Sequence, residues 1–382
     1  MSALPPLVTP VAALSQAERE RTARHHVLMP LGELGQRRLR AAHVAIVGAG
    51  GLGSPAVLAL AAAGVGTLTV IDNDDVELSN LQRQVMHRIV DIGAPKATSA
   101  ARAAADLAPE VRVHAVRERL TARNAERLLS GADVVLDGTD TFATRELVAT
   151  ATESLGIPLV WGVVQGFDAQ VTVFWSAPPA GFPAVRLSDL YPAGSAGDVP
   201  TCAEAGVLGS LCLQVGALMA TQAVHLIAGI GEPLLGRILV IDGLRARQHE
   251  VPLRGRPSDA PAPVSPAAEH EPERVEVAAL RAALSSAAPP LVVDVRGADE
   301  VLAGMIPGAL HVPLPDIQAD PERAADRLWA AAGDRRIAVV CKGGARSDQA
   351  ATLLAARDLD VVSVRGGMRA WTGETVVPEV AR

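Results

Sequence analysis

Residues 44–72 have the sequence VAIVGAGGLGSPAVLALAAAGVGTLTVID, and this stretch decides the fold. The apolar run at 44–47 predicts a buried parallel strand. A glycine turn follows at once, then an alanine-rich helix over 54–63 and a second apolar strand over 67–71, which ends on Asp72. The order of strand, glycine turn, helix, strand and acid is typical of a Rossmann-type nucleotide site. We therefore expect an α/β protein.

The glycine turn predicts a contact with phosphate. Glycine lets the backbone approach a phosphate group, and the N-terminus of the following helix presents free N–H groups and a partial positive charge. Asp72, about twenty residues further on, is placed to bond a ribose hydroxyl. The candidate glycines are Gly48, Gly50, Gly51 and Gly53. These features fit any Rossmann nucleotide binder, and NAD is the default ligand.

The segment after Asp72 indicates a triphosphate instead of NAD. It contains SNLQRQ at 79–84 and GAPK at 93–96, which supply Arg83 and Lys96. A dehydrogenase needs no Arg and Lys converging beside its pyrophosphate. An enzyme that cleaves a triphosphate between the α and β phosphates does, because negative charge develops there.

Motifs in this region resemble the ubiquitin-activating (E1-like) enzymes, and the nearest bacterial group is the MoeB/ThiF adenylyltransferases. They are Gly-x-Gly-Gly-x-Gly, Asp-x-Asp-x-Val-x-x-Ser-Asn-Leu-x-Arg-Gln and Gly-x-Pro-Lys. The resemblance covers about 20–253 and implies an ATP-binding adenylation domain over 21–253. Besides the glycines, the nucleotide-binding residues that it implies are Asp72, Ser79, Asn80, Leu81, Gln82, Arg83 and Lys96.

The resemblance assigns further residues. Arg24 matches an Arg that reaches the ATP phosphates of the partner subunit, which implies a homodimer. Asp140 follows the predicted strand at 132–137, where it is placed to hold Mg²⁺ on the phosphates. Thr141 stands where the family has an Asn that meets the nucleotide. Cys202 matches the family's Cys-x-Glu-x-Gly and is expected to handle the carrier covalently, as a thioester or acyl disulfide, or else to be a buried thiol.

Cysteine usage and charge limit the remaining possibilities. Relatives often bind structural zinc with two Cys-x-x-Cys pairs, but 186–192 and 255–259 contain no cysteine, so we expect no zinc. Three widely spaced cysteines suit a reducing cytoplasm, and we interpret Cys212 as a core residue. A net charge of −7 gives no nucleic-acid footprint. We see no uninterrupted apolar segment long enough to span a membrane, and we expect residues 1–20 to be a disordered tail.

A second domain follows a Pro-rich linker at 254–272 and occupies 273–382. In it, Cys341 leaves the predicted strand at 337–340 and faces backbone N–H groups that open a helix, a nest that binds an anion. The spacing to Arg346 is Cys-x4-Arg, whereas a tyrosine phosphatase uses Cys-x5-Arg. With Asp-Val-Arg, Ile-Pro-Gly-Ala and Gly-Gly-x-x-x-Trp, this loop resembles rhodanese, whose cysteine carries a persulfide. Arg346 either belongs to the persulfide loop or only ties it down.

An adenylation domain joined to a smaller α/β rhodanese domain resembles the MoeZ-type adenylyltransferase–sulfurtransferases. The resemblance implies that ATP and Mg²⁺ adenylate the C-terminal glycine of a ubiquitin-like (β-grasp) sulfur carrier ending in Gly-Gly. The persulfide then gives the carrier thiocarboxylate, for molybdopterin, thiamine or cysteine biosynthesis. The sulfur donor is thiosulfate or a cysteine desulfurase. The alternatives are an NAD-dependent oxidoreductase with a regulatory phosphatase-like domain, and a scaffold that only docks carrier proteins.

Overall fold

The chain forms two compact units, Met1–Ser258 and Asp259–Arg382. The structure is a computed structural model that describes residues 4–192, 206–255, 273–286, 288–333, 335–355, 357 and 359–377. Cys202 and almost all of the expected linker at 254–272 lie outside these described residues. The expected domain boundaries stay predictions.

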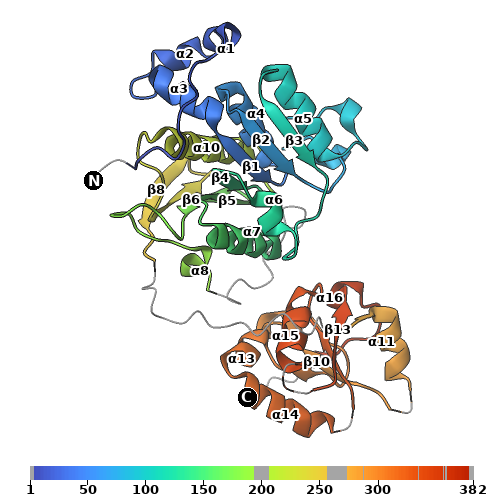
Figure 1. The fold of residues 1–382 in the computed structure, drawn as a ribbon. Coiled ribbons are helices and arrows are strands. Elements are labelled where there is room, and N and C mark those ends of the chain that lie inside the picture. The colour runs from blue at the N-terminus through green and yellow to red at the C-terminus, as the bar shows by residue number, and fades with distance from the viewer. Residues whose placement is uncertain are drawn as a thin grey trace. The chain divides into compact units, whose positions relative to one another are not determined.

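The first unit contains an eight-stranded sheet in the order β3-β2-β1-β4-β5-β6-β7-β8 (Figure 1). The strands are β1 His43–Val47, β2 Thr67–Ile71, β3 Arg112–Val116, β4 Val134–Asp137, β5 Leu159–Gln165, β6 Asp168–Phe174, β7 Arg237–Asp242 and β8 Arg247–Pro252. The first five are parallel to their neighbours, and β6 to β8 continue the sheet in antiparallel pairs. The strand order reverses between β1 and β4, and α/β sheets bind ligands at such a point.

Helices cover both faces of this sheet. One face packs against α3 Gly32–Ala41, α4 Gly53–Ala63, α5 Lys96–Leu107 and α10 Gly209–Ala228. The other face packs against α6 Ala125–Leu129, α7 Phe142–Leu155 and α8 Leu187–Leu190. Because the central strands are buried on both faces, their sequences are continuous apolar runs without alternation. This is why the runs at 44–47 and 67–71 could be assigned from sequence.

The helix α10 corrects one expectation from the sequence. It is 20 residues long, and an 18-residue window of it has a mean hydropathy of 1.6, so it is long and apolar enough to cross a membrane by those measures alone. In the structure, 61% of that window is buried, and α10 packs against α4 and β5. A helix that is apolar nearly all round is found in the core of a large domain as well as in a membrane. The packing of α10 is that of a core helix.

The N-terminal segment is also ordered, contrary to the expected disordered tail. Leu4 and Leu14 are buried, and the Leu7 N–H donates to the Leu226 carbonyl of α10 at 3.2 Å. Ser15 then caps α1 Gln16–Arg21 in a capping box with Glu18. The apolar residues of this segment, Leu4, Leu7 and Val8, pack on the apolar core of the domain.

The second unit is a parallel sheet of five strands in the order β11-β10-β12-β13-β9. The strands are β9 Glu273–Glu276, β10 Leu291–Asp294, β11 Leu310–His311, β12 Ile337–Val340 and β13 Val361–Arg365. The helices are α11 Val277–Leu284, α12 Ala298–Val301, α13 Leu314–Ala319, α14 Pro321–Ala332, α15 Ala345–Ala355 and α16 Gly367–Ala370. Two apolar clusters, one on each face of the sheet, form its core.

A buried ion pair fixes the end of β10. Asp294 is fully buried, and Arg296 donates to it from Nη2 at 2.7 Å and from Nε at 3.0 Å. The same Nη2 also donates to the Gly304 carbonyl at 2.7 Å. The pair therefore joins the strand end to the loop that leads into β11. Removal of either partner leaves a buried charge without compensation.

We expect Arg296→Met to destabilise the second unit by about 3–5 kcal/mol, because Asp294 would remain buried and charged. Hydrogen exchange of the full chain in urea, followed on peptides of β10 and β12, measures the change. Arg365→Met is the matched control, since Arg365 pairs with Glu276 at 3.4 Å with both side chains more than 60% exposed; it should cost at most about 1 kcal/mol. Equal protection in both variants would contradict the assigned role of Arg296.

Candidate active sites

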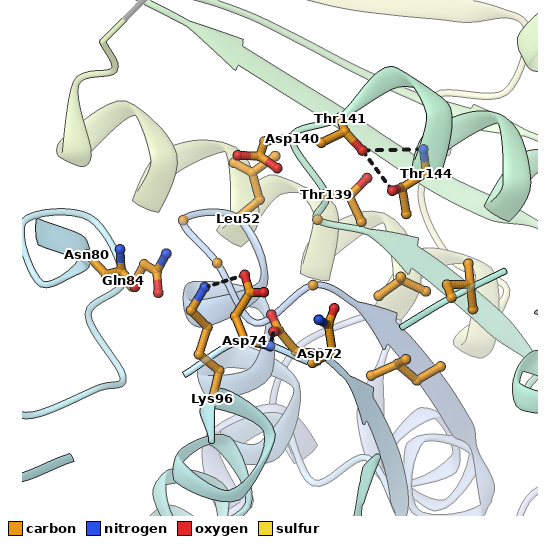
Figure 2. Close-up of a pocket in the computed structure, with 18 of the residues that line it drawn as sticks. Leu52, Asp72, Asp74, Asn80, Gln84, Lys96, Thr139, Asp140, Thr141 and Thr144 are labelled. Atoms are coloured by element: carbon orange, nitrogen blue, oxygen red, sulfur yellow. Dashed lines mark hydrogen bonds and ion pairs between the residues drawn. The ribbon is translucent and has the colours of Figure 1, made fainter. Parts of the chain in front are cut away.

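A cavity of about 950 Å³ opens at the carboxyl ends of β1, β2 and β4 in the first unit (Figure 2). The expected site residues that line it are Gly48, Gly50, Gly51, Asp72, Asn80, Arg83, Lys96, Asp140 and Thr141. Five other expected residues, Gly53, Ser79, Leu81, Gln82 and Arg24, are not among the lining residues. The parallel sheet thus brings most of the expected nucleotide residues to one place.

The glycine turn is packed backbone to backbone. Gly48 has φ +90°, and a Cβ there would lie 3.0 Å from the backbone of Gly138. A Cβ on Gly53 would lie 1.9 Å from the Gly48 carbonyl oxygen. Gly53 is therefore required for the turn to pack on the first turn of α4, although it does not line the cavity.

Asp72 holds the glycine turn as well as facing the cavity. Its Oδ2 accepts the Ala49 N–H at 2.7 Å, and its Oδ1 accepts the Asp74 N–H at 2.8 Å. Burial raises the pKa of Asp72 above its usual value, and these two hydrogen bonds oppose the shift. A carboxylate oxygen has a second lone pair, so both oxygens can still accept from a ribose hydroxyl.

Two of the cations that line the cavity, Lys96 and Arg83, are each held in place. The Lys96 side chain is 9% exposed, and its Nζ lies 3.0 Å from the Asp74 carboxylate, as Figure 2 shows. Arg83 donates from Nη1 to the Ser79 carbonyl at 3.2 Å. Because both side chains are already positioned, a phosphate can bind with little loss of side-chain entropy.

Ser79, Leu81 and Gln82 build the loop that carries Arg83. Ser79 donates to the Glu77 carboxylate, and Asn80 accepts the Glu77 N–H at 3.2 Å. A Cβ on Gly209, the first residue of α10, would lie 2.2 Å from the Gln82 carbonyl oxygen. The loop is thus pressed against α10, and these residues support the site without facing it.

Sequence reasoning missed several residues of the site. Gln84 lines the cavity, is 3% exposed, and its Oε1 has no hydrogen-bond partner within the described residues. Its position in the Arg-Gln motif was a usable signal. His87 is buried and bonds Ser99 Oγ at 2.9 Å and the Ala49 carbonyl at 3.0 Å. Burial lowers the pKa of His87, so a neutral imidazole supports the glycine turn.

Hydrogen bonds to the N–H, hydroxyl and carbonyl of Thr139 fix the turn before Asp140. Asp137 accepts the Thr139 N–H at 2.9 Å and the Thr139 hydroxyl at 2.7 Å. Arg145 of α7 donates to the Thr139 carbonyl at 2.9 Å and also lines the cavity. Thr141 caps α7 by accepting the Thr144 N–H. Asp140 itself is exposed, so its carboxylate is presented at the rim of the cavity by a rigid turn.

Arg24 lies in α2 Ala23–His26, is exposed, and does not line the cavity of its own chain. The neighbouring Arg21 belongs to α1 instead, and donates to the Ala62 carbonyl at 2.7 Å. His25 bonds Gln36 of α3 at 2.8 Å, which ties α2 to α3. Arg24 is therefore carried by a supported helix and is exposed outside this nucleotide site.

Cys212 is buried, as expected of a core residue, but it also lines the cavity. Its Sγ would lie 3.1 Å from a Cβ on Gly51. Within the described residues, no group of three or more His, Cys, Asp or Glu could hold a metal ion. The prediction that the chain has no zinc stays a prediction.

The second unit carries Cys341 directly after β12. Cys341 is fully buried, and its Sγ accepts the Gly344 N–H at 3.0 Å. The loop 341–345 leads straight into α15, so a negative charge on the sulfur would face a backbone N–H and the N-terminal half of a helix.

Arg346 is paired with a carboxylate. Its two terminal nitrogens donate to Glu300 of α12 at 2.6 and 2.9 Å. The Arg346 side chain is 14% exposed. This bidentate pair favours the second of the two expected roles, in which Arg346 ties down the cysteine loop.

The ion pair makes the loop sensitive to acid. The hydrogen bond from Arg346 lowers the pKa of Glu300 to about 2, against 4.5 for an ordinary Glu. A lowered pKa contributes stability above the unfolded value and loses it as the pH falls toward the folded value. From about pH 5 to about pH 3, the hydrogen-exchange protection of peptide 337–347 should fall more steeply in the wild type than in Glu300→Gln. Asp299→Asn, an exposed acid of the same helix, should behave as the wild type, and identical slopes in all three would contradict the assignment.

Comparison with known proteins gives the family. Residues 22–262 match the ThiF family, and residues 276–374 match the rhodanese-like domain. A probable adenylyltransferase/sulfurtransferase MoeZ of Mycobacterium tuberculosis is 41% identical over 97% of both chains. A sulfur carrier protein adenylyltransferase of Thermus thermophilus is 44% identical over 64% of this chain and 90% of its own.

More distant matches agree. The adenylyltransferase and sulfurtransferase MOCS3 of Bos taurus is 35% identical over 96% of this chain and 88% of its own. The solved structure of E. coli MccB shares the fold, with a TM-score of 0.55 at 19% identity, over 63% of this chain and 71% of that one. The chain is thus an adenylyltransferase and sulfurtransferase, and the NAD-dependent alternative is set aside. It belongs to the family of adenylyltransferase/sulfurtransferases in which a ThiF domain precedes a rhodanese-like domain.

Proposed function

We propose that the chain adenylates the C-terminal glycine of a ubiquitin-like sulfur carrier ending in Gly-Gly and then converts it to a thiocarboxylate. The observation that carries this proposal is that Arg83 and Lys96 line one cavity with the glycine turn. Relatives are named for a sulfur carrier protein and for SAMP activation. The family gives the reaction class, and the lining residues suit an anionic nucleotide.

In the first half-reaction, the carrier carboxylate attacks the α-phosphate of ATP. A bond to the α-phosphate forms, and the bond from the α-phosphate to pyrophosphate breaks. Arg83, Lys96 and the partner's Arg24 stabilise the charge that leaves on pyrophosphate. Asp140, with Asp72 and Asp74 nearby in the lining, offers the oxygen ligands that Mg²⁺ prefers. When bound, Mg²⁺ would neutralise charge on the phosphates.

In the second half-reaction, Cys341 supplies sulfur. Its thiolate attacks the outer sulfur of thiosulfate and releases sulfite, or takes sulfur from the persulfide of a cysteine desulfurase. The Cys341 persulfide then attacks the acyl-adenylate carbonyl, releasing AMP and leaving an acyl disulfide. A thiol attacks the Cys341 sulfur, which releases the thiocarboxylate and leaves a disulfide that a dithiol reduces. Cys202 is one candidate for that thiol, and its other candidate role is to hold the acyl group as a thioester.

The conditions follow from this chemistry. The chain would need ATP and Mg²⁺, no zinc, and a reducing compartment such as the cytoplasm, because the persulfide cycle ends in a reducible disulfide. Molybdopterin, thiamine and cysteine biosynthesis all fit a thiocarboxylate product.

The intact mass of a carrier tests the scheme directly. Carriers ending in Gly-Gly are incubated with Mg-ATP, thiosulfate, a dithiol and the full chain. With the wild type, the carrier mass should rise by the difference between sulfur and oxygen as its carboxylate becomes a thiocarboxylate. Cys341→Ala should form AMP without this change in carrier mass. Cys202→Ala distinguishes a chemical thiol from a buried one. If no carrier produces AMP with the wild type, the adenylation proposal fails.

We further propose that the active species is a homodimer in which Arg24 serves the partner's cavity. The connection after α2 exposes three apolar side chains, Val27, Leu28 and Met29, at 76%, 53% and 92%. Exposed apolar residues that cluster beside a functional cation indicate an interface between proteins. A dimer contact there would bury these side chains and bring Arg24 to a second chain.

Mixed dimers test whether Arg24 acts across the interface. Arg24→Ala and Lys96→Ala should each be inactive alone, because each site lacks one cation. Co-expressed in equal amounts, they should recover about a quarter of the wild-type rate of AMP formation, since half of the dimers carry one complete site. Arg24→Ala co-expressed with the double variant Arg24→Ala/Lys96→Ala should stay inactive. No recovery, with mixed dimers seen by native mass spectrometry, would rule out a shared site.

A further inference from the structure

Two buried hydroxyls stand in series behind the Cys341 sulfur. Ser347 of α15 lies with its Oγ 3.6 Å from Cys341 Sγ and donates to the Gly344 carbonyl at 2.8 Å. Ser363 of β13 donates to Ser347 Oγ at 2.9 Å. Both serines have no exposed surface. The Ser363 hydroxyl, in the middle of β13, is thus linked to the Cys341 sulfur through the Ser347 hydroxyl of α15.

The direction of these hydrogen bonds depends on the state of the sulfur. A hydroxyl donates one hydrogen bond and accepts two. With a thiol at Cys341, the S–H and the Ser363 hydroxyl both donate to Ser347, whose own hydrogen is given to Gly344. When the thiol loses its proton to solvent, the sulfur becomes an acceptor only. The Ser347 hydrogen can then turn from the Gly344 carbonyl to the sulfur, while Ser363 continues to hold the Ser347 oxygen.

Local packing does not require a serine in β13. Ser363 shares its face of the sheet with Val361, which packs in a buried apolar cluster, and a hydroxyl buried on that face is stable only when hydrogen-bonded. Ser347 provides the bond that Ser363 makes. The hydrogen bond to Ser347, and not the space to be filled, thus explains why a serine stands at position 363.

The charged side chains around the loop are placed differently from these neutral donors. Arg346 is bound to Glu300, and Lys342 is exposed. From α16, Arg369 is exposed and lies near Gly343, where a Cβ would be 3.7 Å from its Nη1. The sulfur itself contacts the Gly344 N–H and the Ser347 hydroxyl.

We propose that Ser363 is a positioning residue of the sulfur-transfer site, acting through Ser347 to turn a hydroxyl onto the ionised Cys341 sulfur. The inference rests on the proposed role of Cys341. A strand residue in the core thus takes part in activating the nucleophile. Without Ser363, the Ser347 oxygen is free to move, with its hydrogen, toward Gly344.

The test measures how fast iodoacetamide alkylates Cys341 in the full-length protein at neutral pH, by mass spectrometry of the Cys341 peptide. Ser363→Ala and Ser347→Ala should slow alkylation by about fivefold, the effect of losing roughly one net hydrogen bond to the reactive form. Ser363→Thr keeps the hydroxyl and suits a strand, so it should retain the wild-type rate. Thr352→Val is the matched control, because Thr352 lies on α15 and its hydroxyl bonds the Asp348 carbonyl instead.

A wild-type rate for folded Ser363→Ala at neutral pH overturns the proposal, and so does equal slowing by Thr352→Val. If Ser363→Ala does not fold, Ser363→Cys replaces it, since a thiol has similar size but is a weak donor; it should also be slow, and a wild-type rate again overturns the proposal. If neither thiosulfate nor a cysteine desulfurase supplied with cysteine leaves a persulfide on wild-type Cys341, the sulfur-transfer role fails, whereas the alkylation rates decide the role of Ser363 independently.

Discussion

The first unit depends on direct backbone-to-backbone contacts, in which no side chain separates the two segments. A Cβ on Gly53 would overlap the Gly48 carbonyl at 1.9 Å, and one on Gly48 would meet Gly138 at 3.0 Å. A Cβ on Gly216 of α10 would stand 2.3 Å from the Leu52 carbonyl oxygen. The turn after β1, the loop after β4 and α10 therefore meet directly. Their contact sets the floor of the cavity and turns the N-terminus of α4 toward any ligand within it.

Around that floor, the cationic and polar groups are held before a ligand arrives. Lys96 is paired with Asp74, Arg83 is bonded to Ser79, and Arg145 clamps the turn that presents Asp140. Burying a lysine is costly unless a partner compensates its charge, and Asp74 gives that compensation. A site whose donors are already oriented needs little reorganisation when charge develops on pyrophosphate, which is the basis of electrostatic catalysis.

The sequence allowed the local elements to be predicted better than their long-range partners. The strands at 67–71 and 337–340 were predicted to the residue, because Gly66 and Asp72 bound the first run and Arg336 and Cys341 bound the second. His87 and Ser363 gave no comparable signal, since each acts through a partner distant in the sequence, Ala49 and Ser347 respectively. The N-terminal leucines misled for the same reason: their burial depends on a helix more than 200 residues away in the sequence.

The two sites stabilise negative charge by different means, and the chemistry explains the difference. The nucleotide cavity uses full positive charges, because pyrophosphate carries several negative charges and only has to leave. The Cys341 sulfur must first hold a negative charge and then attack. A thiolate that is stabilised too strongly becomes a poorer nucleophile, so a cation in direct contact would slow the transfer that it prepares. The structure instead gives the sulfur a backbone N–H donor, places the Ser347 hydroxyl where it can turn to the ionised sulfur, and binds the nearby Arg346 to Glu300. Neutral donors stabilise the sulfur anion and still leave it free to react.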